Sequence, residues 1–151
     1  MADLPPTPSS SELDALGARL QAALGDAYLV EGRLGAGGFA VVFQVADVHL
    51  KRKLAVKVLS PDVIASHSVL ERFRREAETV AQLSHPHIVK LHFIGQKEDL
   101  VYLVMEMIDG GSLADRLQRE QMLPIADAAR IFGEVASALA HAHKRGVVHR
   151  D

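Results

Sequence analysis

A glycine-rich run between two stretches of strand-forming residues limits the folds open to this chain more than any other feature. The run GAGG occupies residues 35–38, after the strand-like residues 28–34 and before the sequence VVFQV at 41–45. Because both flanks favour strands, the pattern predicts an antiparallel hairpin with the glycines at its turn. Glycines also let backbone amides approach a phosphate without a Cβ in the way.

Two functional interpretations of this run differ in what must follow it. A dinucleotide-binding turn requires a strand before the glycines and a helix after them, with the phosphate on the helix N-terminus. Here the residues after Ala40 have strand chemistry, so we reject that interpretation. A plain hairpin turn and a phosphate-covering hairpin both remain open from the run alone.

Hydrophobic periodicity divides the rest of the chain. Residues 1–27 read as a flexible, proline- and serine-rich leader followed by a short helix that leans on the domain after it. Further strands are expected at 54–59, 88–94 and 100–107, and helices at 69–83, from Leu113 with Ser112 as its cap, and at about 125–145. The predicted fold class is therefore α+β.

Composition excludes several classes of protein. The 151 residues carry a net charge of −2, which argues against an electrostatic nucleic-acid binder and a polybasic membrane-surface protein. The absence of cysteine excludes disulfides and thiolate chemistry. The N-terminus lacks the features of a secretory signal, and no apolar run approaches the ~18 residues of a membrane span. A cytoplasmic location is expected, and the sequence leaves open an anchor beyond residue 151.

Two charged residues lie in apolar patterns. Lys57 is in the middle of the strand-like sequence LAVKVL, and Glu76 lies on the apolar side of the helix expected at 69–83. An edge-strand lysine reaching solvent would explain the first residue, and a surface pair with a neighbouring arginine would explain the second. A Lys57–Glu76 pair would satisfy both charges at once.

The chain ends with His149, Arg150 and Asp151. Taken together and in order, the glycine-rich run, Ala55-Val56-Lys57, Glu76 and this final tripeptide resemble the eukaryotic-like bacterial serine/threonine protein kinases. The resemblance covers about residues 28–151. It implies a small lobe at 28–107, with a five-stranded antiparallel sheet and one packed helix, and a hinge with the first helices of an incomplete large lobe at 108–151.

The resemblance also implies roles for individual residues. Lys57 would contact the α- and β-phosphates of ATP, Glu76 would orient Lys57, and Asp151 would accept the proton of the substrate hydroxyl. Val80, Leu91 and His149 would stack between the lobes, and His149 would be packed. The nucleotide would be bound by Leu34, Gly35, Ala36, Gly37, Gly38, Val42, Ala55, Lys57, Met105, Glu106, Ile108 and Ser112.

The sequence departs from the family pattern at its end. The residues that hold Mg²⁺ in these kinases would follow Asp151, so no metal ligand is expected here, and none of the eight histidines has the spacing of a metal site. We therefore expect a kinase by family whose 151-residue chain does not turn over alone. The alternative is a short, non-catalytic protein that binds a nucleotide or a partner kinase. In the 151-residue chain the apolar stripe at 125–145 would be left exposed, which predicts marginal stability or aggregation. A short protein with its own function would instead be expected to have polar residues there.

Overall fold

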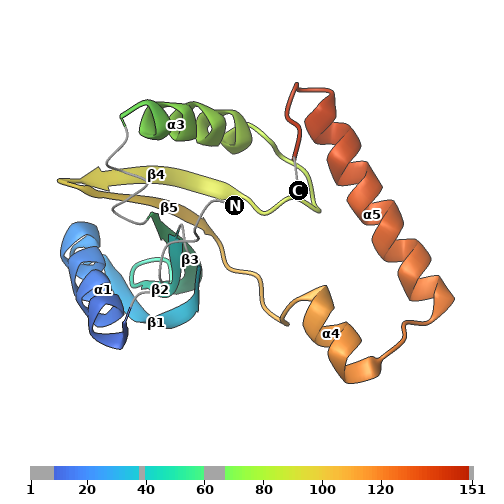
Figure 1. Cartoon of the computed structure of the whole chain (residues 1–151), viewed down its shortest axis with the longest axis horizontal. Coiled ribbons are helices and arrows are strands. Elements are labelled where there is room, and N and C mark those ends of the chain that lie inside the picture. The colour runs from blue at the N-terminus through green and yellow to red at the C-terminus, as the bar shows by residue number, and fades with distance from the viewer. Residues whose placement is uncertain (1–8, 38–39, 60–66, 150–151) are drawn as a thin grey trace, which may run out of the picture.

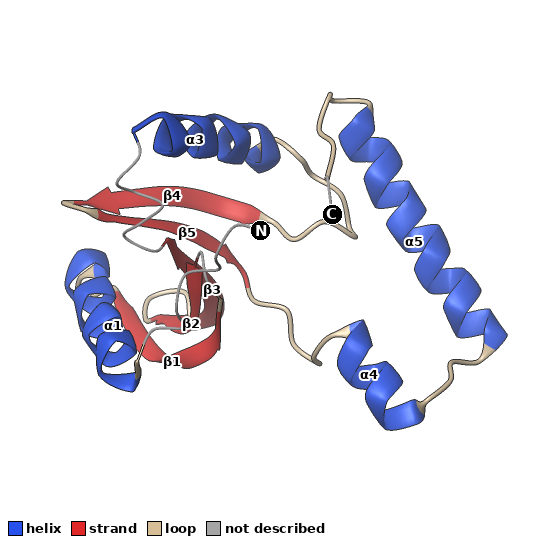
Figure 2. Ribbon diagram, in the orientation of Figure 1, coloured by secondary structure: helices blue, strands red, loops and turns tan. Residues whose placement is uncertain are grey.

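The computed structural model describes residues 9–37, 40–59 and 67–149, without the side chains of residues 67–69, 72, 73 and 76. It contains a five-stranded sheet and helices on both of its faces, followed by two more helices (Figure 1, Figure 2). The elements are α1 (Ser10–Leu24), β1 (Tyr28–Ala36), β2 (Ala40–Asp47), β3 (Arg52–Leu59), α3 (His67–Ala81), β4 (Leu91–Lys97), β5 (Leu100–Glu106), α4 (Leu113–Glu120) and α5 (Ile125–His143).

The sheet is antiparallel throughout and has the strand order β1-β2-β3-β5-β4. The turn between β2 and β3 is fixed by Asp47, whose buried carboxylate accepts hydrogen bonds from the Leu50 N–H at 3.0 Å and the Arg52 Nε at 3.3 Å. These bonds, that of Leu50 first, lower the pKa of Asp47. The α+β class and the five-stranded antiparallel sheet predicted from the sequence are confirmed.

In the part of the chain that the structure describes, α1 covers one face of the sheet and α3 covers the other (Figure 1). On the α1 face, Leu13 and Leu20 of the helix join alternate residues of three strands in the main core, which includes Val41, Phe43, Val45, Leu54, Val56, Val58, Leu100, Tyr102 and Val104. On the other face, Leu70 and Ala77 of α3 pack in two smaller clusters with Leu59, Leu91, Val101 and Leu103. The side-chain alternation of each strand therefore supplies two cores.

Helix α1 forms where a capping box begins it and a glycine ends it. The Ser9 hydroxyl accepts from the Glu12 N–H at 3.4 Å, the Glu12 carboxylate accepts from the Ser9 N–H at 2.7 Å, and Gly25 has a φ of +72°. Burial of Leu13 and Leu20 against the sheet confirms that this helix leans on the following domain.

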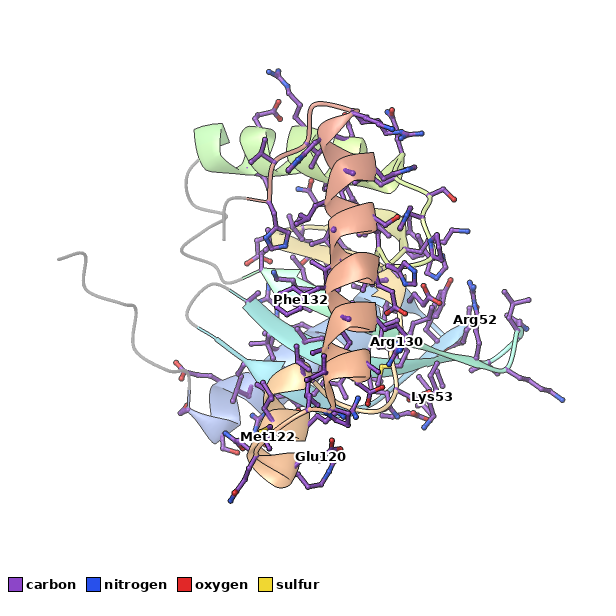
Figure 3. The ribbon with its side chains drawn as sticks, turned by 90° about the vertical axis from the view of Figure 1, so that its right-hand side faces the viewer. Arg52, Lys53, Glu120, Met122, Arg130 and Phe132 are labelled. Atoms are coloured by element: carbon purple, nitrogen blue, oxygen red, sulfur yellow. The ribbon has the colours of Figure 1, made fainter. Side chains whose placement is uncertain are left out.

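The segment after β5 is less buried. Ser112 begins α4 as predicted, through a capping box with Asp115. Helix α5 buries Ala138 and Ala142 but exposes much of its apolar stripe, including Phe132, Val135 and Leu139. Figure 3 looks at the molecule from the side of α5 and labels Phe132 on this helix and Met122 before it. No helix within the described ranges is long and apolar enough to cross a membrane.

Several element boundaries differ from the prediction by one to three residues. Strand β4 begins at Leu91 rather than Ile88, because residues 85–88 form a turn in which the Ile88 N–H donates to the His85 carbonyl at 3.1 Å. Helix α3 ends at Ala81 rather than Leu83, and α5 ends at His143, just before Gly146 with its φ of +76°.

Candidate functional site

The glycine-rich hairpin is present, with β1 before the turn and β2 after it. Gly35 pairs with Val42 and Ala36 with Val41, and the Gly37 N–H donates to the Ala40 carbonyl at 2.9 Å. Gly38, which was predicted to bind nucleotide, lies outside the described residues. A helix does not follow this turn, so the rejection of a dinucleotide-binding turn is confirmed.

The protein's own packing does not explain the glycine at position 35. A Cβ built on Gly35 would meet nothing within 4 Å, and no positive φ requires a glycine there. Leu34 beside it is 47% exposed. The glycine-rich turn end of the hairpin therefore borders open space. A ligand could approach its backbone closely at Gly35, because no side chain stands in the way.

Lys57 lies in the middle of β3, between Val42 of β2 and Leu103 of β5 in the register of the sheet. Its neighbours Val56 and Val58 are fully buried in the core on the α1 face. Because successive side chains alternate, Lys57 belongs to the opposite face, the one that α3 covers. Its side chain is half-buried there.

The predicted partner of Lys57 can be located only by its backbone. Glu76 lies in α3, but its side chain is outside the described part of the structure. The next residue, Ala77, is buried against Leu103, the residue opposite Lys57 in the sheet. This turn of α3 therefore lies over the part of the sheet that carries Lys57, and the ion pair itself stays a prediction.

Four of the predicted nucleotide-binding residues lie on one face of three adjacent strands. Val42 is opposite Lys57, Ala55 precedes Lys57 by two residues on the same strand, and Ala55 is opposite Met105 of β5. All four are half-buried. They form a continuous surface of three apolar side chains and one ammonium group, which we name the Lys57 face. A flat apolar ring with an anionic tail would match this surface.

The linker after β5 supplies the remaining predicted contacts. The Glu106 N–H already donates to the Lys90 carbonyl at 2.9 Å, which fixes the start of the linker to the segment before β4. Ile108 is 56% exposed, and its N–H donates to no described residue. Ile108 is one of the residues predicted to bind the nucleotide, and its N–H is free of other described partners.

Ser112 is held in place by a neighbour that the sequence analysis missed. Its hydroxyl donates to the Asp115 carboxylate at 2.6 Å and accepts from the Asp115 N–H at 3.1 Å. These contacts, the hydroxyl's first, lower the pKa of Asp115. One lone pair of the hydroxyl is left for a ribose donor. The S-x-x-D spacing was a sequence signal for this capping box.

The last described residues add little to the candidate site. Asp151, the predicted proton acceptor, lies outside the described residues. His149 is exposed because no described element covers it, so the prediction that it is packed between the lobes is wrong. Leu91 is buried and Val80 is half-buried. Among the described residues, no three histidine, aspartate or glutamate side chains form a group that could hold a metal ion.

Known proteins resemble this chain over the same region. A sequence model of the family described as protein kinase domain matches residues 28–151. The serine/threonine-protein kinase PrkC of Bacillus subtilis is 37% identical over 118 residues, which cover 78% of this chain and 18% of that protein. The serine/threonine-protein kinase PknJ of Mycobacterium tuberculosis is 41% identical over 124 residues, covering 82% and 21%.

A solved structure shows the same arrangement of elements. The crystal structure of the PknI kinase domain of Mycobacterium tuberculosis superposes with a TM-score of 0.71 at 34% identity, covering 83% of this chain and 52% of that chain. The chain thus spans about a fifth of the curated relatives' length and about half of the solved kinase domain.

Proposed function

The chain belongs to the protein kinase domain family, and on that premise we propose that it is the ATP-binding portion of a serine/threonine protein kinase. The proposed reaction is transfer of the γ-phosphoryl group from Mg-ATP to a protein hydroxyl. The observation that supports the proposal is the Lys57 face, which lies beside the open turn end of the glycine-rich hairpin. We further propose the division into residues 1–27, a small lobe at 28–107, and a hinge with the start of a large lobe at 108–151.

The proposed roles follow from where each group lies. Val42, Ala55 and Met105 would contact the adenine ring, because they form the apolar part of the Lys57 face. The exposed Ile108 N–H would donate to the edge of the ring. The Lys57 ammonium would neutralise charge on the α- and β-phosphates, and its half-buried position strengthens that attraction relative to a solvated lysine. Glu76 would orient Lys57, and Asp151 would accept the hydroxyl proton.

Magnesium would lower the charge on the phosphates of bound ATP. The described residues do not form an acidic group suited to the ion. We therefore propose that this chain binds the nucleotide without holding its metal and does not transfer phosphate alone. The cytoplasm is the proposed location.

Nucleotide binding by the 151-residue chain tests the proposal. Isothermal titration calorimetry should detect binding of ATP to the parent chain. Lys57→Met should weaken the affinity for ATP by about tenfold or more, because a charge-assisted contact is worth about 1.5–3 kcal/mol. Lys53→Met is the matched control: this lysine is exposed near the start of the same strand, four residues before Lys57, and is labelled in Figure 3. Its affinity should equal that of the parent chain.

Three results would count against parts of the proposal. Equal ATP affinity of the parent chain and Lys57→Met would remove the role of Lys57. A parent chain that does not bind ATP would overturn nucleotide binding by this chain. Magnesium-dependent tightening, or phosphate transfer to a generic protein substrate such as casein, would overturn the proposal that the chain acts without holding the metal.

A further inference from the structure

Helix α1 precedes the residues that match the family, yet it is built into the sheet. Leu20 is fully buried in the main core with Val45 and Val56, and Leu13 joins the same cluster. The helix lies on the face of the sheet opposite α3 (Figure 1). It therefore does more than lead into the domain, because removing it would expose a large part of the core.

The last turns of α1 contact both edge strands of the sheet. On one side the Lys97 Nζ, at the end of β4, donates to the Ala22 carbonyl at 2.7 Å, and Arg19 pairs with Asp99 in the turn before β5. On the other side Gln21 bonds to β1. Since β1 and β4 are the two edges, this short stretch of helix links strands that do not touch each other in the ladder.

The Gln21 amide acts on β1 as a neighbouring strand would. Its Nε2 donates to the Tyr28 carbonyl at 2.9 Å, and its Oε1 accepts from the Val30 N–H at 2.8 Å. Backbone groups two residues apart point to the same side of a strand, and β2 occupies the other side of β1. Gln21 therefore satisfies the free edge of β1 at the point where the strand begins.

This anchor lies immediately before the irregular part of β1. The pairing with β2 shifts register between Val30 and Gly32 and again between Arg33 and Gly35, which is where the glycine-rich turn begins. Each bulge weakens the ladder locally. The regular hydrogen bonds at the start of β1, including the two to Gln21, therefore orient the strand. The orientation of the strand in turn determines where the glycines lie relative to the Lys57 face.

We propose that Gln21 is a positioning residue for the nucleotide: by clamping Tyr28 and Val30 it holds β1, and through β1 the glycine-rich turn, in the place where ATP binds. The inference rests on the proposed function. It assigns to a helix outside the matched region a part in nucleotide affinity, without any contact between the helix and the ligand.

The test compares three variants of the full chain by hydrogen exchange and by ATP affinity. Gln21→Met keeps the size of the side chain and removes both bonds to β1, together with the 3.3 Å bond from Nε2 to the Gly25 carbonyl. Gln21→Glu at pH 8 keeps an acceptor for the Val30 N–H but loses the donor to Tyr28. Arg19→Met is the control, because it breaks a contact of the same helix with the opposite edge of the sheet.

We expect Gln21→Met to speed amide exchange at residues 30–37 and to raise the ATP Kd by about fivefold, the equivalent of one ordinary hydrogen bond. The exchange rate and the ATP Kd of Gln21→Glu should lie between those of Gln21→Met and of the parent chain. Arg19→Met should match the parent chain in both measurements. A purely structural glutamine would lower the melting temperature while leaving the Kd and the exchange at 31–37 unchanged, and that result would overturn the inference.

The two proposals fail in different ways. If the parent chain does not bind ATP, the proposed function fails, while exchange at 30–37 still decides whether Gln21 holds the hairpin. If the parent chain binds ATP and both Gln21 variants bind it equally well with unchanged exchange, the inference fails alone. If Gln21→Met does not fold, the comparison of Gln21→Glu with Arg19→Met decides the question.

Discussion

The sheet with α1 and α3, and the pair α4 and α5, use similar amphipathic patterns but bury them very differently. In the sheet region, side chains such as Leu20, Val56 and Val104 are almost completely removed from solvent. In the helix pair only Ala138 and Ala142 are buried among the described residues, while Ile125 is 89% exposed and Phe132 is 75% exposed. Both regions have the hydrophobic periodicity of elements that pack against a partner.

The difference shows that a stripe of apolar residues predicts packing against another element but does not show whether this chain contains that element. The strands place their alternate residues against two helices that belong to the same chain, so the region completes its own core. Helix α5 touches the sheet region through the loop before β4, where the His85 ring lies within 3.1 Å of the Ser137 hydroxyl. Its remaining apolar side chains contribute little to the stability of this chain.

The largest expected effect comes from truncating one apolar side chain in each region. Leu20→Ala should lower the free energy of unfolding by about 2–5 kcal/mol, because it leaves a cavity in the main core. Phe132→Ala removes a larger side chain but should change that free energy by less than about 0.5 kcal/mol, as expected for an exposed position. Urea unfolding followed by circular dichroism measures both. A Phe132→Ala loss comparable to that of Leu20→Ala would mean that α5 packs as tightly as α1.

Local patterns predicted most of this fold because each element carries its own signal. Strand alternation and the Ser112 cap lie within a few residues of sequence, and both were confirmed. The predicted start of β4 was wrong. Ile88 is apolar, as a strand residue would be, but it belongs to a turn in which its N–H donates to the His85 carbonyl. The bonds of Gln21 to β1 could not be predicted, since a single glutamine in a helix gives no sign of which backbone groups it will meet.

For the candidate site, local patterns predicted the strands that carry its residues but not the order of those strands in the sheet. The sequence placed Val42, Ala55, Lys57 and Met105 in strands, and the sheet register brings these residues together on one face. Strand order is a non-local property: β3 lies beside β5 although α3 and β4 intervene in the chain. The family resemblance rather than periodicity supplied that adjacency. The Lys57–Glu76 pair and the role of Asp151 stay predictions, because the structure does not describe the side chains of Glu76 and Asp151.

A pair of glycine substitutions, one in each region, should produce the next largest effect. A Cβ at Gly95 in β4 would overlap the ring and hydroxyl of Tyr102, so Gly95→Ala should destabilise the sheet by about 1–3 kcal/mol. A Cβ at Gly133 in α5 would meet nothing within 4 Å. Gly133→Ala should therefore stabilise the helix by about 0.5–1 kcal/mol through backbone entropy alone. Thermal unfolding of both variants measures these shifts, and a destabilising Gly133→Ala would reveal a packed surface on α5.

The smallest expected effect concerns the joint between the two regions, which is lined by histidines. The His85 ring centroid lies 5.5 Å from that of His87 and 5.1 Å from that of His141 of α5. The His87 Nδ1 is 4.0 Å from a Glu134 carboxylate oxygen, and the His85 Nε2 lies 3.1 Å from the Ser137 hydroxyl. This joint thus places three imidazoles and one carboxylate in contact, so its strength should depend on pH.

Desolvation, followed by the positive charges of Arg145, His85 and Lys144, lowers the pKa of His141 below its ordinary value. Protonation is then easier in the unfolded chain, so stability is complete above about pH 6.5 and falls as the pH drops from there toward the lower pKa of the folded state. His141→Phe removes the titrating group, and its melting temperature should fall less between pH 7 and 5 than that of the parent chain. His143→Phe, which alters an exposed residue of the same turn, is the matched control variant. Equal slopes for the parent chain and His141→Phe would mean that the joint adds no pH dependence and that the sheet region alone sets the stability of the chain.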